Sequence, residues 1–149
     1  MDRFSQETAS AILAVFPEWR QLAREEQRED GSSYFVLLID PPAEAAVDRG
    51  LLIHTDKGEV TVGFDFYHSH FDSAVGDGEH FGTGAAIAFV RQIVSEQIAV
   101  VSWWRDDEWR GSSQVEAGAQ PAALLVKEYN RVRVRSWKGS FNADTRHPE

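Results

Sequence analysis

Residues 60–72, VTVGFDFYHSHFD, alternate in polarity in a way that constrains the fold more than any other stretch. Successive side chains of a strand point to opposite faces, so residues two apart share a face. The alternation predicts one strand whose first face carries Val60, Val62, Phe64, Phe66, His68, His70 and Asp72. The other face would carry Thr61, Gly63, Asp65, Tyr67, Ser69 and Phe71. We expect this strand and the loop after it to lie at or beside the functional surface.

The rest of the chain predicts helices combined with antiparallel strands. Apolar residues recur at helical spacing over residues 5–23, where Pro17 breaks or kinks the helix, and again over residues 83–97. Residues 24–30 would end the first helical region, and the tail from Asn142 would be frayed. Alternating or β-rich runs predict strands at residues 34–40, 51–54, 59–66, 98–104, 109–116 and 130–136. We therefore predict a single α+β domain over residues 1–149, with N-terminal helices and one later helix on a mainly antiparallel sheet.

Several classes of protein are disfavoured by composition. A chain of 149 residues can bury a hydrophobic core without disulfide bonds or a structural metal ion. Its lack of cysteine excludes disulfides and thiolate chemistry. No apolar run approaches the length of a membrane span, and the N-terminus lacks the form of a signal peptide. We expect a cytoplasmic protein with no membrane association and no cofactor.

The charge is acidic and unevenly distributed. The formal net charge is −9, and residues 31–80 hold nine acidic against two basic side chains. Proteins that bind nucleic acids usually neutralise phosphates with Lys and Arg, so this balance argues against a nucleic-acid partner. An acidic surface favours a cationic partner and speeds its capture, although solubility alone is an equally common reason for acidity.

The histidines of residues 60–72 suggest two kinds of enzymatic site. His68, His70 and Asp72 would alternate on one face and could bind zinc, completed by His80 or Glu79. The run resembles the H-x-H-x-D-H signature of metallo-β-lactamase-type hydrolases, but Ser73 stands where that family has its last histidine. A small metal-dependent hydrolase is therefore the alternative function.

A histidine general base is the second possibility. His68 or His70 would need a carboxylate to orient it, and Asp65 or Asp72 are the nearest in sequence. A regular strand would point Asp65 away from both imidazoles. The chain has no G-x-S-x-G nucleophile motif, so covalent catalysis has little support.

Tryptophan and arginine are grouped in the second half of the chain. Trp103, Trp104 and Trp109 surround an acidic triplet, and tryptophan is frequent at binding hot spots as well as in cores. The run of residues 130–136 places Arg131, Arg133 and Arg135 on one face of a strand. In an acidic protein we expect these arginines to form internal ion pairs, in preference to a phosphate-binding stripe.

Four stretches are similar to segments of a known family. GFDFYHSHFD, VVSWW, DEWRGS and VRVRSWKGSFNAD, within residues 60–142, resemble immunity proteins of bacterial polymorphic toxin systems, including contact-dependent growth inhibition. The resemblance implies a cytoplasmic antidote, and no enzyme, that binds the C-terminal toxin domain of a cognate effector and blocks its active site. Such toxins are often nucleases, whose basic clefts would complement an acidic inhibitor.

The expected partner-binding residues combine acidic and aromatic side chains. Acidic groups would meet the cationic cleft of the toxin, with aromatic and imidazole side chains as anchors and two tryptophans as secondary anchors. These residues are Asp65, Tyr67, His68, His70, Phe71, Asp72, Asp77, Glu79, Trp104 and Trp109.

Overall fold

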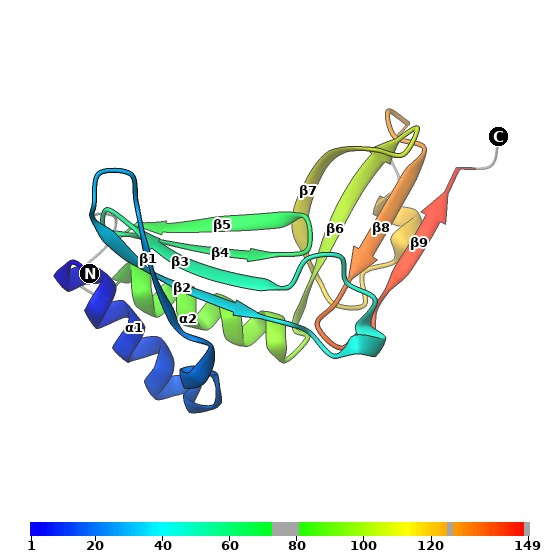
Figure 1. Cartoon of the computed structure of the whole chain (residues 1–149). Helices are drawn as coiled ribbons and strands as arrows, with labels where there is room; N and C mark the ends of the chain where they lie inside the picture. The colour runs from blue at the N-terminus through cyan, green and yellow to red at the C-terminus, as the bar shows by residue number, and fades with distance from the viewer. Residues whose placement is uncertain (73–80, 125–126, 148–149) are drawn as a thin grey trace. The chain divides into compact units, whose positions relative to one another are not determined.

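The computed structural model describes residues 1–72, 81–124 and 127–147 and has the predicted α+β class, with helices and two antiparallel sheets (Figure 1). The chain folds as two compact units. Unit 1 comprises Met1–Ile39, Gly50–Gly63 and His68–Arg91, and unit 2 comprises Asp40–Arg49, Phe64–Tyr67 and Gln92–Glu149. The prediction of a single domain over residues 1–149 stays a prediction.

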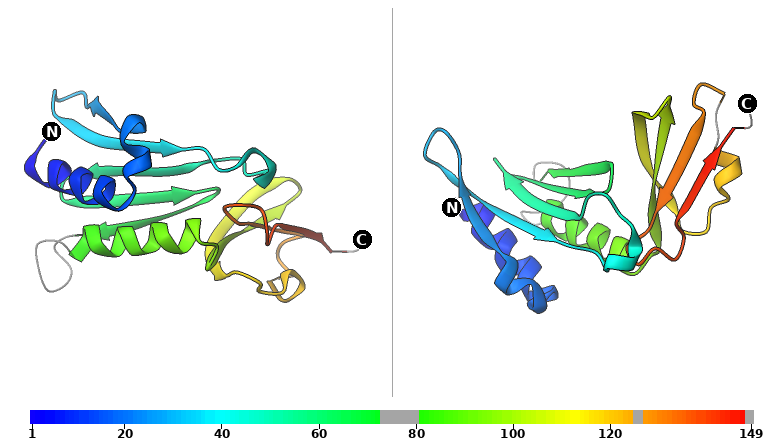
Figure 2. Two further views of the ribbon diagram at one scale, coloured as in Figure 1. Left: turned by 90° about the horizontal axis from the view of Figure 1, so that it is seen from below. Right: turned by 45° about the vertical axis from the view of Figure 1, so that its right-hand side comes forward.

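Unit 1 is built on a sheet of strand order β1-β2-β3-β4-β5, with two α-helices on the same face of that sheet (Figures 1 and 2). The strands are β1 Arg24–Gln27, β2 Ser33–Ile39, β3 Leu51–Asp56, β4 Glu59–Phe64 and β5 Tyr67–Asp72. The helices are α1 Arg3–Val15, the 3₁₀ helix η1 Pro17–Leu22 and α2 Phe81–Val94.

The start and end of α1 follow from its sequence. Asp2 caps it by accepting a 2.7 Å hydrogen bond from the Ser5 amide. Pro17 then begins η1, as the predicted break requires. The buried face of α1 includes Ala9 and Ile12, and the Ser5 hydroxyl of α1 forms a 2.6 Å hydrogen bond with the Thr55 hydroxyl of the sheet.

The core of unit 1 lies between the helices and one face of the sheet. Alternate strand residues on this face are buried, among them Phe35, Leu37, Leu51, Ile53, Val60 and Val62. Helix α2 contributes Ala86, Phe89 and Val90. In the described part of unit 1, no helix lies on the opposite face of this sheet (Figure 2).

The predicted continuous strand of residues 60–72 is wrong, because the chain turns at Asp65 and Phe66. Strand β4 ends at Phe64, β5 begins at Tyr67, and the two are neighbours in the sheet. A two-residue turn reverses the face of every later residue. His68 and His70 therefore lie on the face opposite Val60 and Val62 and are exposed, whereas the valines are buried. Asp65 adopts a left-handed backbone (φ 50°), which Asp tolerates better than most residues.

Residues 24–30, predicted to end the first helical region, instead contain the edge strand β1. Arg24 to Gln27 pair antiparallel with Val36 to Ser33 of β2. All four side chains of β1 are exposed and charged or polar, a composition that protects a sheet edge from pairing with other chains. The pairing with β2 supplies hydrogen bonds that a solvated helix end would have lacked.

Unit 2 contains a second antiparallel sheet of order β7-β6-β8-β9. Its strands are β6 Ile98–Arg105, β7 Glu108–Glu116, β8 Arg131–Arg135 and β9 Ala143–Arg146. Two short 3₁₀ helices, η2 Ala43–Ala45 and η3 Pro121–Leu124, complete it. Its core contains Ala99, Val101, Val132 and Val134, with Trp103 packed against them.

Residues 142–147 are not frayed as predicted for the tail from Asn142. Residues Ala143 to Arg146 pair with Val134 to Arg131, and Asn142 donates to the Ala45 carbonyl. The arginines of β8 hold β9 in place, because the Arg131 guanidinium binds both carboxylate oxygens of Asp144. A segment with few apolar residues is thus ordered by a partner strand and an ion pair.

Candidate functional site

The predicted partner-binding residues fall into two groups, one in each unit. His68, His70, Phe71 and Asp72 belong to unit 1, and Asp65, Tyr67, Trp104 and Trp109 belong to unit 2. Asp77 and Glu79 lie outside the described residues. The two groups are two candidate surfaces, and each is built from different elements.

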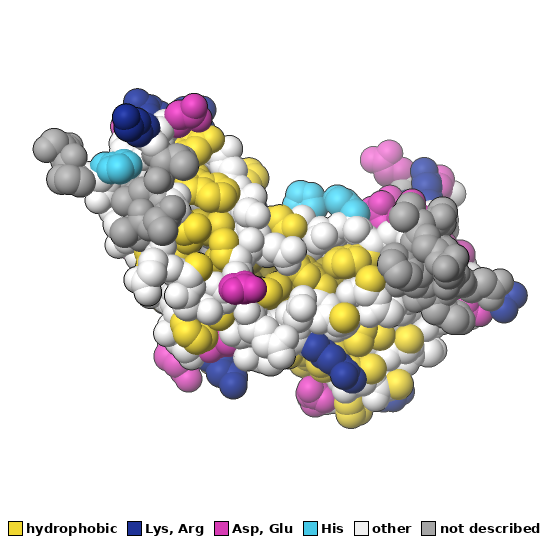
Figure 3. Space-filling model, turned by 180° about the vertical axis from the view of Figure 1, so that it is seen from behind, with side chains coloured by type: hydrophobic (Ala, Val, Ile, Leu, Met, Phe, Trp, Pro, Cys, Tyr) yellow, Lys and Arg dark blue, Asp and Glu magenta, His cyan; other side chains and the backbone are white. Residues whose placement is uncertain are grey.

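In unit 1, His68 and His70 project from β5 on the face without helices. Their ring centroids are 5.0 Å apart with the planes nearly perpendicular. Neighbouring histidine side chains are visible at the surface in the space-filling view (Figure 3). Phe71 points the other way and packs on Phe89 of α2, with centroids 5.5 Å apart. Of these three predicted anchors, the two histidines are therefore presented on the uncovered face.

The carboxylate that contacts His70 is Glu59, not Asp65 or Asp72 as the sequence suggested. The His70 Nδ1 atom lies 2.6 Å from Glu59 Oε1 and 3.1 Å from Thr61 Oγ1, both on the adjacent strand β4. A carboxylate only accepts, so Nδ1 carries the proton and donates it. The hairpin at Asp65 and Phe66 brings these residues together. The sequence signal for this turn was weak, because the favoured glycine is missing from it.

The uncovered face of the unit 1 sheet also has a hollow of about 380 Å³ over β1, β2 and β3. It is lined by Arg24, Glu26, Tyr34, Val36, Leu38, Leu52 and His54. Leu38 is 44% exposed, an unusual value for a leucine in the middle of a sheet. The lining of the hollow thus combines apolar side chains of β2 and β3 with charged and aromatic side chains of β1, β2 and β3.

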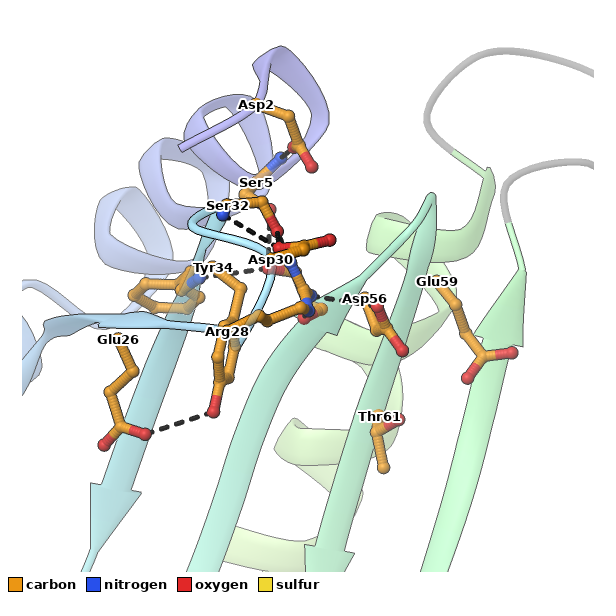
Figure 4. A network of polar contacts seen from close by, with 12 residues as sticks. Asp2, Ser5, Glu26, Arg28, Asp30, Ser32, Tyr34, Asp56, Glu59 and Thr61 are labelled. Carbon is orange, nitrogen blue, oxygen red and sulfur yellow. Dashed lines mark hydrogen bonds and ion pairs between the residues drawn. The ribbon is translucent and has the colours of Figure 1, made fainter.

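The lining of this hollow is held in part by the contacts drawn in Figure 4. Tyr34 donates to Glu26, and the Arg28 guanidinium lies 4.5 Å from the centre of the Tyr34 ring. Arg28 also forms a 2.9 Å ion pair with Asp56 and donates to the Thr55 carbonyl. A guanidinium stacked on the ring and bonded to β3 restricts the orientation of Tyr34. No motif or spacing in the sequence marks Arg28, Tyr34 or Leu38 as functional residues.

In unit 2, Phe66 gathers the aromatic residues predicted as secondary anchors. Its centroid lies 4.9 Å from that of Trp104 and 5.8 Å from that of Trp109. The Arg49 guanidinium stacks over Phe66 at 4.4 Å. Trp109 is 46% exposed, so one indole of this cluster reaches solvent. We call Phe66, Trp104, Trp109 and Arg49 the aromatic cluster of unit 2.

Asp65, the predicted acidic contact, is buried beside this cluster. It is only 5% exposed, and its Oδ1 accepts a 3.4 Å hydrogen bond from the Asp48 amide. Within the described part of the chain, its other oxygen has no hydrogen-bond partner. Burial raises the pKa of Asp65, and the nearby Arg133 charge offsets this in part. Asp65 is therefore a strained interior group whose carboxylate is not presented to a partner.

Two of the three arginines of β8, Arg131 and Arg133, form the internal ion pairs that the sequence predicted. Arg133 is buried and pairs with Asp48, and Arg131 pairs with Asp144. The hydrogen bond from Arg133 lowers the pKa of Asp48, and the hydrogen bond from Arg131 lowers the pKa of Asp144. Arg135 donates to the Ala46 and Ala143 carbonyls. These guanidinium groups are engaged within unit 2.

The described residues do not assemble the predicted zinc set. Within residues 1–72, 81–124 and 127–147, no three His, Cys, Asp or Glu side chains form a group that could hold a metal ion. The proposed additional ligands, Glu79 and His80, lie outside these ranges.

Comparison with protein-family models, with curated proteins and with solved structures finds no match to this chain. Among the described residues, no helix combines the length and the apolar character needed to cross a membrane.

Proposed function

We propose that this protein is an immunity protein that binds the toxin domain of a cognate effector in the cytoplasm and occludes its active site. The observation that carries the proposal is the uncovered face of the unit 1 sheet, with its hollow around Leu38 and its exposed histidines. A surface that combines exposed apolar side chains with aromatic and charged ones has the composition of a protein interface.

Charge supports a basic partner. Unit 1 holds twelve acidic and six basic residues, a formal charge of −6, and unit 2 holds twelve against nine, a charge of −3. A nuclease domain grips phosphates with Lys and Arg, so its cleft is complementary to such a surface. Occlusion of that cleft requires only binding by complementary charge and shape.

In the proposed complex the unit 1 face makes the main contact. Leu38 and Leu52 meet apolar side chains of the toxin, and Tyr34, His54, His68 and His70 surround them. Asp72 adds negative charge at the β5 edge. The aromatic cluster of unit 2, with Trp104 and Trp109, is the secondary contact surface, and Tyr67 directly follows Phe66 of this cluster in the chain.

A calorimetric titration tests the proposal. The full chain is titrated with the toxin domain encoded by the neighbouring upstream gene, with its catalytic residue inactivated. We expect one-to-one binding and loss of toxin activity at the same ratio. Failure of the wild-type chain to bind this domain contradicts the proposed function.

Two matched leucines locate the surface. Leu38→Asp places a charge in the hollow, whereas Leu22→Asp changes a leucine of similar exposure, 40% against 44%, at the end of η1. We expect Leu38→Asp to weaken binding by about thirtyfold or more, the effect of a hot-spot residue, and Leu22→Asp to leave affinity within about threefold. Equal effects of the two substitutions contradict the assignment of this surface and leave the function itself standing.

A further inference from the structure

The histidine pair of β5 has a feature that docking does not require. Both imidazoles extend from the same face of an edge strand, two residues apart, and their centroids converge to 5.0 Å. Residues two apart on a strand are separated by about 6 to 7 Å along the backbone. The rings therefore lean toward each other.

Glu59 and Thr61 fix the chemical state of one member of the pair. Because the Glu59 carboxylate accepts from His70 Nδ1, the proton resides on Nδ1 and the lone pair of a neutral ring is left on Nε2. Thr61 Oγ1, at 3.1 Å, shares the same Nδ1 proton. Within the described part of the chain, both hydrogen bonds of His70 are made at Nδ1. A carboxylate that orients an imidazole in this way is the usual support of a histidine that ligates a metal.

The spacing of the rings fits one shared ion. With metal–nitrogen bonds of about 2.0 Å, two imidazoles on one tetrahedral ion have centroids about 5 Å apart. The two rings now lie edge to face, so the His68 ring must turn before both rings can bind the same ion. His68 is exposed, and exposed side chains change rotamer on the picosecond-to-nanosecond scale. His70 is the ring already held in place.

We propose that His68 and His70 together bind one divalent transition-metal ion of the kind that prefers imidazole, such as Zn²⁺, Ni²⁺ or Cu²⁺. Glu59 and Thr61 act as positioning residues and do not touch the ion. Two protein ligands leave the other coordination positions to water or to a group from a bound partner. The site differs from the three-ligand set that the sequence suggested, because Asp72 has no role in it. It goes beyond the proposed function, in which the same two histidines contact the toxin, and metal binding by the free chain does not require that function.

Zn²⁺ titration of the tag-free full chain tests the site. Calorimetry is expected to give one Zn²⁺ per chain, and long-range ¹H–¹⁵N spectra to show coordination at His70 Nε2. His68→Ala and His70→Ala are each expected to lower affinity by at least about tenfold. His54→Ala is the matched control, because it removes a partly exposed histidine from β3 of the same sheet and should leave Zn²⁺ binding unchanged.

The role of Glu59 has its own readout. Glu59→Gln is expected to weaken Zn²⁺ binding by about tenfold, the loss typical of a support to a metal ligand, and to shift the metal-free His70 ring away from the Nδ1–H tautomer. A structural role alone would leave the tautomer unchanged.

Three outcomes overturn the proposal. The first is a wild-type affinity for Zn²⁺ no higher than that of a chain carrying both His68→Ala and His70→Ala. The second is loss of Zn²⁺ binding in only one of the two single variants. The third is loss of Zn²⁺ binding in the His54→Ala control.

Discussion

Asp65 shows how one residue sets the geometry of its surroundings. Its left-handed backbone makes the turn between β4 and β5, and this turn decides which face of the sheet His68 and His70 occupy. Its side chain is buried, and one of its oxygens has no hydrogen-bond partner in the described part of the chain. Such a group lowers stability where it is charged.

The pH dependence of stability should report the buried carboxyl of Asp65. Because burial raises its pKa, the folded state holds this proton more tightly than the unfolded chain does. The destabilisation by the charged form is complete above the raised pKa and disappears as the pH falls to the ordinary value. Asp65→Asn, which keeps a side chain that tolerates the left-handed backbone, should therefore stabilise the protein at pH 7 and lose this advantage in acid.

Urea unfolding of both chains at a series of pH values measures the difference. If the gain in unfolding free energy of Asp65→Asn is the same at every pH, the buried charge of Asp65 is not its cause.

Arg133 should be the most costly arginine of β8 to remove. It is buried, it pairs with Asp48, and its charge acts on Asp65. Arg133→Ala leaves two carboxylates without their cation, and we expect a loss of about 3 kcal/mol in the free energy of unfolding. Arg110→Ala, which breaks an exposed pair with Glu108, should change stability by less than about 1 kcal/mol. Chemical denaturation of both variants measures their free energies of unfolding. Similar losses in Arg133→Ala and Arg110→Ala would contradict a larger contribution from the buried pair.

At the scale of elements, the loop between β8 and β9 depends on a close backbone approach. Gly139 has φ 81°, and a Cβ at this position would lie 3.0 Å from the Ala45 Cα atom and 3.3 Å from Asn142 Nδ2. The loop thus packs directly on η2, which follows β2 in the chain. Only glycine meets both the conformational and the steric requirement.

Substitution of two glycines by alanine should have opposite effects. Gly139→Ala is expected to destabilise the protein by about 2 kcal/mol through backbone strain and the contact with Ala45. Gly84→Ala, in α2 with open space around the new methyl group, should stabilise it by up to about 1 kcal/mol. Thermal unfolding of the two variants provides the comparison. A neutral Gly139→Ala would show that the loop shifts at little cost.

The whole molecule is acidic, and both units contribute to the charge of −9. At physiological ionic strength the field of exposed charges is screened beyond about 8 Å. Long-range attraction therefore acts on the association rate of a basic partner more than on the lifetime of the complex.

The association rate with the toxin domain should fall as salt is added. Raising the ionic strength from 0.02 to 0.5 M is expected to lower the rate constant by about tenfold or more, with little change in the dissociation rate. Stopped-flow mixing at several salt concentrations measures both. An association rate that is insensitive to salt would contradict electrostatic steering by this chain.

The sequence by itself determined most of the local structure. Helical periodicity and Pro17 predicted α1 and the break before η1, and β-rich runs predicted β2, β3, β6, β7 and β8. It also predicted the ion pairs of Arg131 and Arg133 in β8, because a guanidinium in an acidic protein finds carboxylates nearby. The helices and strands depend on spacing along the chain, which the sequence shows directly, whereas the ion pairing was predicted from the acidic composition.

Only the tertiary structure decided which side chains of residues 60–72 share a surface. A turn without glycine at Asp65 and Phe66 leaves the alternation of polarity intact but reverses the faces that follow it. The same turn brings Glu59 and Thr61 to His70, a pairing across strands that no local spacing encodes. Strands β1 and β9 likewise exist because neighbouring strands supply their hydrogen bonds, and such long-range pairing overrides local preference.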